Sequence, residues 1–240
     1  MSYHFEFRPV LARADLLIQG LLVTIGLTVA AVIVGTALGI ILASARAMRG
    51  GIVRLLIDSY VEVFRNTPFL VQLFLLYFAL PSLGLRMTVT EAALIGMAVN
   101  LGAYAEEIIR AGIESIHRSQ IEAGLSLGLT PVQIFRRIVI PPAIANVYPA
   151  LCSQYVLMML GSSLCSVIAM QELTAVSAQI GSDTYHFFEV YIIVTLLYLA
   201  LVLLMRGALA FLGNLMFGRG TLFFGRSVRV TARPVSAGAP

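Results

Sequence analysis

Two stretches of this 240-residue chain carry no charged side chain, residues 16–45 and residues 138–171. Each is longer than the roughly 20 apolar residues that a helix needs to cross a bilayer. The whole chain is 59% hydrophobic and only 12% charged, whereas a soluble domain carries about 25% charged residues. The sequence therefore excludes a soluble globular protein and predicts an all-α integral membrane fold.

The polarity of the chain predicts five transmembrane helices. They cover residues 16–43, 55–81, 92–110, 143–160 and 187–212. Pro68 lies within the second span, where its missing N–H predicts a kink. The prolines at 141 and 142 predict a stop before the fourth helix, and Gly161-Ser162-Ser163 predicts a break after it, followed by a shorter segment. The remaining parts are an N-terminus (residues 1–15), a transmembrane domain (16–216) and a loosely ordered tail (217–240).

Small residues recur every fourth position in the first span. They are Ala31, Gly35, Gly39 and Ala43. Such a stripe lets two helix backbones approach closely. We expect it to pack within this chain rather than to form a dimer seam.

The arginines give the predicted orientation. All 16 basic residues are arginine, and most follow the first span, follow the third span or lie in the tail. Cytoplasmic loops carry the excess of positive charge, so the N-terminus is predicted outside and the C-terminus inside. No basic patch with aromatic residues between the arginines is present, which argues against a nucleic-acid partner.

The loop at about 113–142 is predicted to fold as two short helices. Ser119 with Glu122, and Thr130 with Gln133, have the spacing of capping boxes, and Gly128 is placed to end the first helix. Ile134, Phe135 and Ile138 are expected to form an apolar face. A folded loop of this kind predicts a docking partner.

Three motifs carry a resemblance to a known family. The first is Glu122-Ala123-Gly124, then Gly128, and after nine residues Ile138-Val139-Ile140-Pro141. This stretch resembles the EAA loop of bacterial ABC-importer membrane subunits, with Gly124 in place of the second alanine and Ile140 in place of leucine. The stretches 62–68 (EVFRNTP) and 103–112 (AYAEEIIRAG) resemble the polar amino acid branch, of histidine, glutamine, arginine or opine type.

The resemblance implies a multi-pass permease subunit of the bacterial inner membrane. Its partners would be a second permease subunit, identical or related, two ATP-binding subunits and an extracytoplasmic binding protein that delivers an amino-acid-like solute. The implied coupling residues are Glu122, Ala123, Gly124, Gly128, Ile138 and Pro141. The partner ATPase would bind ATP and Mg²⁺, and this chain, which has neither a P-loop nor any lysine, needs no cofactor of its own.

Charged and polar residues within spans are candidates for the solute path, because they are costly in a membrane. Arg65 and Glu107 could meet the charges of the solute or form a structural ion pair with each other. Asn100, Tyr104 and Glu107 share one helix face, whereas Glu106 is expected to point elsewhere. Further candidates are Gln72, Gln154, Ser162 and Ser163. The segment 160–164 lacks a lysine that related permeases carry there.

Other classes of function find little support in the sequence. No catalytic residues are assigned, because no histidine lies within a predicted span to form an intramembrane Ser–His pair. The three histidines are far apart and the two cysteines, Cys152 and Cys165, are too distant on one helix to bridge, so neither a metal site nor a disulfide is predicted. The alternative is a stand-alone secondary transporter, but the chain shows no inverted repeat.

Overall fold

The computed structural model describes residues 4–48 and 50–217, and all regular structure in this part of the chain is helical. The α-helices are α1 Arg8–Leu11, α2 Ala14–Met48, α3 Ile52–Arg65, α4 Phe69–Phe74, α5 Val89–Glu114, α6 Arg118–Ser126, α7 Pro131–Ile134, α8 Ile140–Gly161, α9 Leu173–Thr184 and α10 Phe187–Phe217. Wider π-helical turns, η1 Leu75–Ala79 and η3 Phe135–Val139, and tighter 3₁₀ turns, η2 Leu80–Leu83 and η4 Ser162–Ile168, continue some of them. The predicted tail beyond Phe217 lies outside the described residues.

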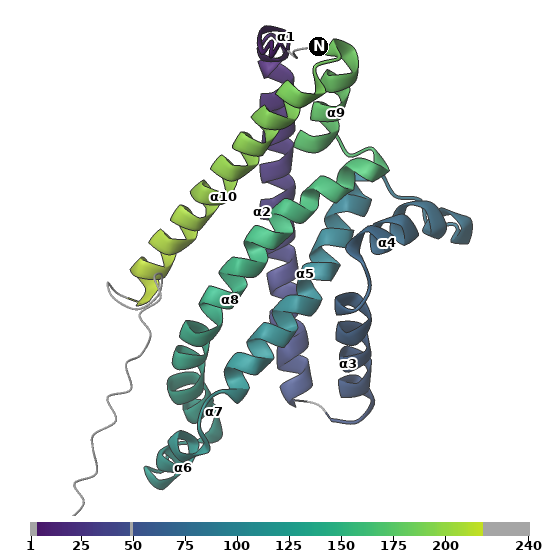
Figure 1. The fold of residues 1–240 in the computed structure, drawn as a ribbon. Helices are drawn as coiled ribbons and strands as arrows, with labels where there is room; N and C mark the ends of the chain where they lie inside the picture. The colour runs from purple at the N-terminus through teal and green to yellow at the C-terminus, as the bar shows by residue number, and fades with distance from the viewer. Residues whose placement is uncertain (1–3, 49, 218–240) are drawn as a thin grey trace, which may run out of the picture.

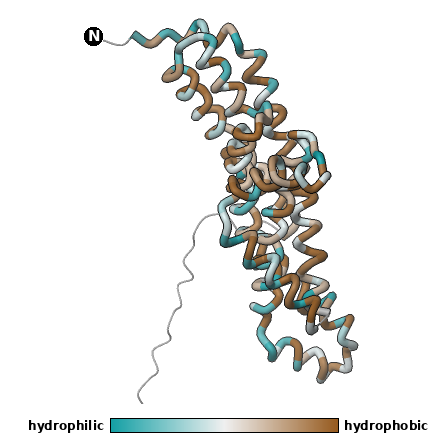
Figure 2. Tube along the Cα trace, turned by 90° about the vertical axis from the view of Figure 1, so that its right-hand side faces the viewer, coloured by the Kyte–Doolittle hydropathy of each residue, from teal (hydrophilic) through white to brown (hydrophobic). Residues whose placement is uncertain are grey.

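Four continuous helical stretches are long and apolar enough to cross a membrane. They are Ala14–Ala47, Val89–Glu114, Pro131–Ile168 and Phe187–Phe217. A fifth candidate is the pair Ile52–Arg65 and Phe69–Leu83, whose two parts meet at 108°. The structure thus has four candidate spans, or five if the bent pair counts as one, and Figure 2 shows that apolar residues cover much of the helical trace.

The chain turns sharply at Pro68, where the sequence predicts a kink. Pro68 is extended (ψ 133°) and precedes the first residue of α4. A residue before proline avoids the helical region, so α3 ends at Arg65. The side chains of Asn66 and Thr67 donate to the carbonyls of Glu62 and Val63, at 2.9 and 2.8 Å, and satisfy the end of the helix. The result is a break that sends α4 sideways from the bundle (Figure 1).

The glycines of the first span pack α2 against α5. A Cβ built on Gly35 would lie 2.9 Å from the carbonyl oxygen of Ala98, and one on Gly39 would lie 2.5 Å from the Cβ of Ala105. No larger side chain fits at this distance. The prediction that the small residues pack within the chain is confirmed at these two glycines.

The predicted proline stop before the fourth span is wrong. Helical structure runs without interruption from Pro131 through η3 and α8 to Ile168. The prolines at 141 and 142 fall in the first turn of α8, where a missing N–H costs little. The expected break at Gly161 is present as a change of helix type, because α8 ends there and the 3₁₀ turn η4 follows.

The ends of the bundle differ in what they hold. α1, α9 and the start of α10 gather at one end, and α6 and α7 lie at the other (Figure 1). The long helices α2, α5 and α8 connect the two ends.

Candidate functional site

A polar cavity of about 240 Å³ lies where α5, α8 and the break before α4 meet. Its lining residues are Thr67, Phe69, Asn100, Tyr104, Gln154, Leu157, Met158, Gly161 and Leu164. Three residues predicted for the solute path, Asn100, Tyr104 and Gln154, are thus brought together from two helices. The cavity has polar groups on one part of its wall and apolar side chains on the rest, which suits a small polar solute.

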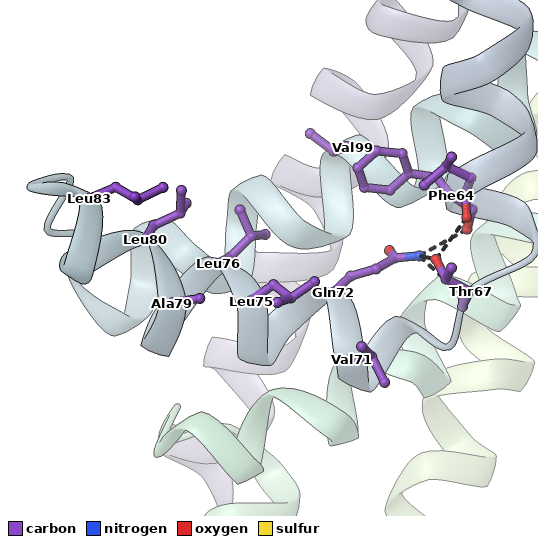
Figure 3. A pocket seen from close by; sticks show the side chains of 11 residues that line it. Phe64, Thr67, Val71, Gln72, Leu75, Leu76, Ala79, Leu80, Leu83 and Val99 are labelled. Atoms are coloured by element: carbon purple, nitrogen blue, oxygen red, sulfur yellow. Dashed lines mark hydrogen bonds between the residues drawn. The ribbon is translucent and has the colours of Figure 1, made fainter.

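Gln72 stands behind this cavity and holds its wall in place. Its Nε2 donates to the carbonyl oxygens of Phe64 and Thr67, at 2.9 and 3.1 Å, and to Thr67 Oγ1 at 2.9 Å (Figure 3). Its Oε1 accepts a hydrogen bond from Asn100 Nδ2 at 2.9 Å. The side chain itself faces a separate, largely apolar cavity of about 410 Å³ between α3 and α4. Gln72 therefore joins both sides of the break at Pro68 to α5.

The predicted ion pair between Arg65 and Glu107 is present. Arg65 Nη1 lies 3.5 Å from Glu107 Oε1, and the guanidinium sits 5.6 Å from the centre of the Tyr104 ring. Glu107 also accepts a shorter hydrogen bond, 2.6 Å, from Arg110. The pair lies one helical turn from Tyr104 and is partly exposed, so its carboxylate and guanidinium border the polar cavity without lining it.

Glu106 points away from Glu107, as expected for adjacent residues on a helix. Its carboxylate is fully buried and lies 3.6 Å from Arg46 Nη1, at the end of α2. Arg46 makes its closer contact, 2.7 Å, with Asp58 on α3. These charges tie α2, α3 and α5 together outside the cavity.

The two serines predicted for the path lie elsewhere. Ser162 is buried and donates to the carbonyl oxygen of Met159 at 2.6 Å. Ser163 is half-buried, donates to the carbonyl oxygen of Leu160 at 2.7 Å and lines a small recess beside Tyr198 on α10. Neither serine is among the residues that line the polar cavity, so their role in the path stays a prediction.

One buried polar cluster was not foreseen from the sequence. Glu172 is fully buried between the spans, where its Oε1 accepts from the N–H of Ala175 at 2.9 Å and caps α9. Its Oε2 accepts from the hydroxyl of Tyr198 at 2.8 Å. Burial raises the pKa of the Glu172 carboxyl, against the lowering effect of these hydrogen bonds. The available signal was its position, as the first charge after the uncharged run that ends at Gln171.

The first helix of the predicted coupling loop begins two residues earlier than expected. His117 is the N-cap of α6, since its Nδ1 accepts from the N–H of Ser119 at 3.3 Å. The predicted capping box of Ser119 and Glu122 is therefore wrong, because Ser119 already lies within the helix. The second predicted box is confirmed, with Thr130 and Gln133 exchanging hydrogen bonds at the start of α7.

Gly128 ends α6 as predicted. Its φ is +74°, its N–H donates to Leu125 O at 2.9 Å, and the next N–H, of Leu129, donates to Gly124 O at 3.1 Å. This pair of bonds defines a Schellman C-cap. Of the remaining predicted coupling residues, Glu122, Ala123 and Pro141 are exposed, whereas Gly124 is buried.

The apolar face of the loop differs in part from the prediction. Ile134 is buried, and Ile138 packs in the same cluster, together with Ile116, Val139 and Ala143. Phe135 is 44% exposed and lies outside this cluster. Three further apolar side chains are exposed on α6, α7 and their connection, namely Leu125, Leu127 and Val132. A helical loop that buries one apolar side and exposes another is suited to bind a protein partner.

The histidines and cysteines form no site in the described residues. No group of three or more His, Cys, Asp or Glu side chains there could hold a metal ion. Cys152 and Cys165 are buried free thiols. The chemistry available at the polar cavity is therefore hydrogen bonding, flanked by one ion pair.

Comparisons with known proteins agree with this architecture. The chain is 33% identical over 204 residues to a putative glutamine transport system permease protein of Rickettsia bellii, covering 85% of this chain and 92% of the relative. It is 32% identical over 212 residues to an arginine transport system permease protein of Bacillus subtilis, covering 88% and 95%.

Solved structures show the same fold. An amino acid ABC transporter crystallised with histidines is 36% identical, with a TM-score of 0.82 over 88% of this chain and 99% of that one. The MetNI methionine ABC transporter has a TM-score of 0.69 at 21% identity, over 85% and 98%. Residues 35–217 match the family described as binding-protein-dependent transport system inner membrane component. The chain belongs to this family and is a membrane permease subunit of an ABC transporter, not an enzyme.

Proposed function

We propose that this chain moves a polar amino acid, or a derivative of one, across the bacterial inner membrane as one of two permease subunits of an importer. The observation that carries the proposal is the polar cavity among apolar helices, with Asn100, Tyr104 and Gln154 on its wall. Polar side chains inside a membrane are costly and line transport paths. The curated relatives named above are glutamine and arginine permeases. Family membership removes the alternative of a stand-alone secondary transporter.

The ion pair beside the cavity supplies charges of both signs. An amino acid carries an ammonium and a carboxylate, and Glu107 and Arg65 present the complementary groups at 3.5 Å from each other. Each is partly exposed, so a solute can reach both. In this proposal the pair holds the zwitterionic head of the solute, and the neutral cavity receives its side chain.

The α6–α7 loop is proposed as the docking site of the ATPase. It lies at the opposite end of the bundle from α1 and α9 (Figure 1). Exposed Glu122, Ala123 and Leu127 give it a mixed polar and apolar surface. ATP and Mg²⁺ would be bound by two such ATPase subunits, so movement of α6 would transmit their closure to α5 and α8.

The proposed topology has five spans, counting α3 and α4 with η1 and η2 as one bent span. The N-terminus would then be extracytoplasmic and the C-terminus cytoplasmic, with an external binding protein meeting the end that holds α1 and α9. Single cysteines at Arg86 and Leu127, both exposed, test it in a variant whose two natural cysteines are replaced by alanine. In cells that express the permease without its ATPase subunits, a membrane-impermeant maleimide should label position 86 in intact cells and position 127 only in inverted membranes. The opposite pattern would refute the orientation.

The transport function is tested in proteoliposomes that contain the permease, its ATPase subunits and the binding protein. Uptake of radiolabelled amino acids should require ATP and the binding protein. Asn100→Leu should abolish uptake while leaving co-purification of the ATPase unchanged, because no residue of α6 or α7 lines the cavity. As a matched control, Leu199→Ala alters an exposed residue of α10 and should leave uptake intact. Normal uptake by Asn100→Leu would remove the cavity from the path.

A further inference from the structure

The hydrogen bonds of Gln72 determine which way the amide of Asn100 faces. Gln72 Nε2 lies within 3.1 Å of three acceptor oxygens, the carbonyls of Phe64 and Thr67 and the hydroxyl of Thr67. Only an N–H group can satisfy three acceptors, so the nitrogen of Gln72 must face them and its oxygen must face Asn100. Asn100 then has to turn its own NH₂ group toward Gln72, which it does at 2.9 Å.

This arrangement leaves the oxygen of Asn100 as a fixed acceptor. Asn100 is only 6% exposed and lines the polar cavity. No residue in the described part of the chain donates a hydrogen bond to its Oδ1. A reversal of the amide would place two nitrogens, or two oxygens, against each other and would leave buried groups unpaired, which costs free energy. The cavity therefore favours a solute that places a hydrogen-bond donor at this point.

The other polar groups of the cavity complete the pattern. Thr67 is committed, since its hydroxyl donates to Val63 O and accepts from Gln72. The hydroxyl of Tyr104 donates to the carbonyl oxygen of Arg65 at 3.4 Å. Gln154, on the facing helix α8, makes no side-chain hydrogen bond to any described residue, so its amide can still donate and accept. None of the lining residues is charged.

We infer that the cavity selects a solute whose side chain ends in a neutral carboxamide. The NH₂ of such a group would donate to Asn100 Oδ1, and its C=O would accept from Gln154. A carboxylate side chain has the same shape but offers no donor, so it would oppose the oxygen of Asn100. A guanidinium or ammonium offers donors but would be buried without a counter-charge in the wall. Gln72 is then a positioning residue, which acts on the solute through Asn100.

This inference rests on the proposed role of the cavity, and the test separates the two. The permease is purified with its ATPase subunits, without the binding protein, and equilibrium binding of radiolabelled glutamine is measured by scintillation proximity. Unlabelled glutamine, glutamate, arginine and methionine compete. Glutamine should bind about 10- to 100-fold more tightly than glutamate, as expected for one lost hydrogen bond and one unpaired acceptor. Equal competition by glutamate or arginine would overturn the inference and leave the transport function standing. The absence of binding by any amino acid, with each of the four tested as the labelled ligand, would overturn both.

Two variants test the residues that the inference names. Asn100→Asp places a carboxylate in the cavity, so glutamine should lose its advantage and arginine should gain affinity. Gln72→Met releases the amide of Asn100, so the ratio of glutamine to glutamate affinity should fall toward one. Loss of binding for all four amino acids alike would instead indicate a purely structural role for Gln72.

Controls keep these variants interpretable. Gln179→Met removes an exposed glutamine of α9 and should preserve the ratio. Co-purification of the ATPase reports whether Gln72→Met is folded. If that variant fails to assemble, Asn100→Asp decides the matter, and an unchanged preference for glutamine over arginine would refute the inference.

Discussion

Gly124 lies so close to Ile138 that a Cβ built on the glycine would be 2.7 Å from the isoleucine Cδ1. Ile134 is the next neighbour, with its Cγ1 at 3.0 Å. This contact joins α6 to η3 at the buried position 124, which holds glycine where the EAA pattern has alanine. The space that a methyl group would need is filled from the other side by Ile134 and Ile138.

We predict that Gly124→Ala is nearly neutral. The added methyl group meets only the ends of flexible isoleucine side chains, which can move by a rotamer change. Alanine is also about 0.5–1 kcal/mol more favourable than glycine within a helix, which offsets the crowding. Thermal stability in detergent and co-purification of the ATPase should both stay close to wild type.

A larger side chain at the same place should separate the two effects. Gly124→Leu cannot be accommodated by rotamer changes alone, so it should push α6 away from η3 and reduce ATPase co-purification. The pair Gly124→Leu with Ile138→Ala restores space and should recover docking. If Gly124→Leu docks normally without the second change, the packing of α6 on η3 is not what positions the loop.

Gly128→Val is predicted to impair docking for a different reason. Nothing lies within 4 Å of a Cβ built at this position, so the side chain has room. The cost comes from φ +74°, a conformation that is unfavourable by about 1 kcal/mol or more for a residue with a Cβ and worse for a β-branched one. The end of α6 should rearrange, and solute-stimulated ATP hydrolysis should fall. Gly128→Asn is the control, because asparagine tolerates this conformation and should retain activity. Full coupling in the valine variant would show that the cap is dispensable.

The sequence predicted mainly those structural features that a few adjacent residues determine. The break at Pro68, the cap at Thr130 and the end of α6 at Gly128 each depend on a few adjacent residues. The capping error at Ser119 is of the same local kind, since His117 and Ser119 can both accept a hydrogen bond from the start of a helix. The sequence around these two residues does not by itself show which of them is the N-cap of α6.

The contacts that build the cavity depend on which helix faces meet. Gln72 and Asn100 were both candidates, but their hydrogen bond crosses from α4 to α5 and fixes the roles of both. Glu172 meets Tyr198 on α10, and neither was singled out. Charge and spacing identify residues that are unusual in a membrane, whereas their partners follow from packing that no local pattern encodes.

Arg65→Gln should reduce transport by about tenfold or more, because a hydrogen bond to a charged group contributes roughly 1.5–3 kcal/mol. Assembly should survive, since Glu107 keeps its 2.6 Å hydrogen bond with Arg110. Uptake in proteoliposomes and co-purification of the ATPase provide the two readouts. Arg54→Gln is the control, as this exposed arginine lies 3.8 Å from Asp58 and away from the cavity.

Exchanging the charges of Arg65 and Glu107 is a poor test of the same pair. An arginine at position 107 would face Arg110, so failure of the exchange would not distinguish a solute contact from a structural pair. Arg65→Gln avoids this conflict. Wild-type uptake in that variant would rule out a solute contact at Arg65.

The buried Glu172 predicts a stability that depends on pH. Burial raises the pKa of this carboxyl above its ordinary value of 4.5, so the folded chain retains a proton that the unfolded chain has already released. Its contribution to stability is therefore complete below the ordinary pKa and is lost as the pH rises through the raised one.

Glu172→Gln does not titrate, and its amide oxygen can still cap α9. Melting temperatures of the wild type and of Glu172→Gln are measured by size-exclusion chromatography after heating, at a series of pH values. The wild-type value minus the Glu172→Gln value should fall steadily as the pH is raised from about 4.5. Asp183→Asn serves as the control for removing a carboxylate from the same helix. A difference between the wild type and Glu172→Gln that does not change with pH would mean that the carboxyl is ionised in the folded protein, held by Tyr198 and the N–H groups of α9.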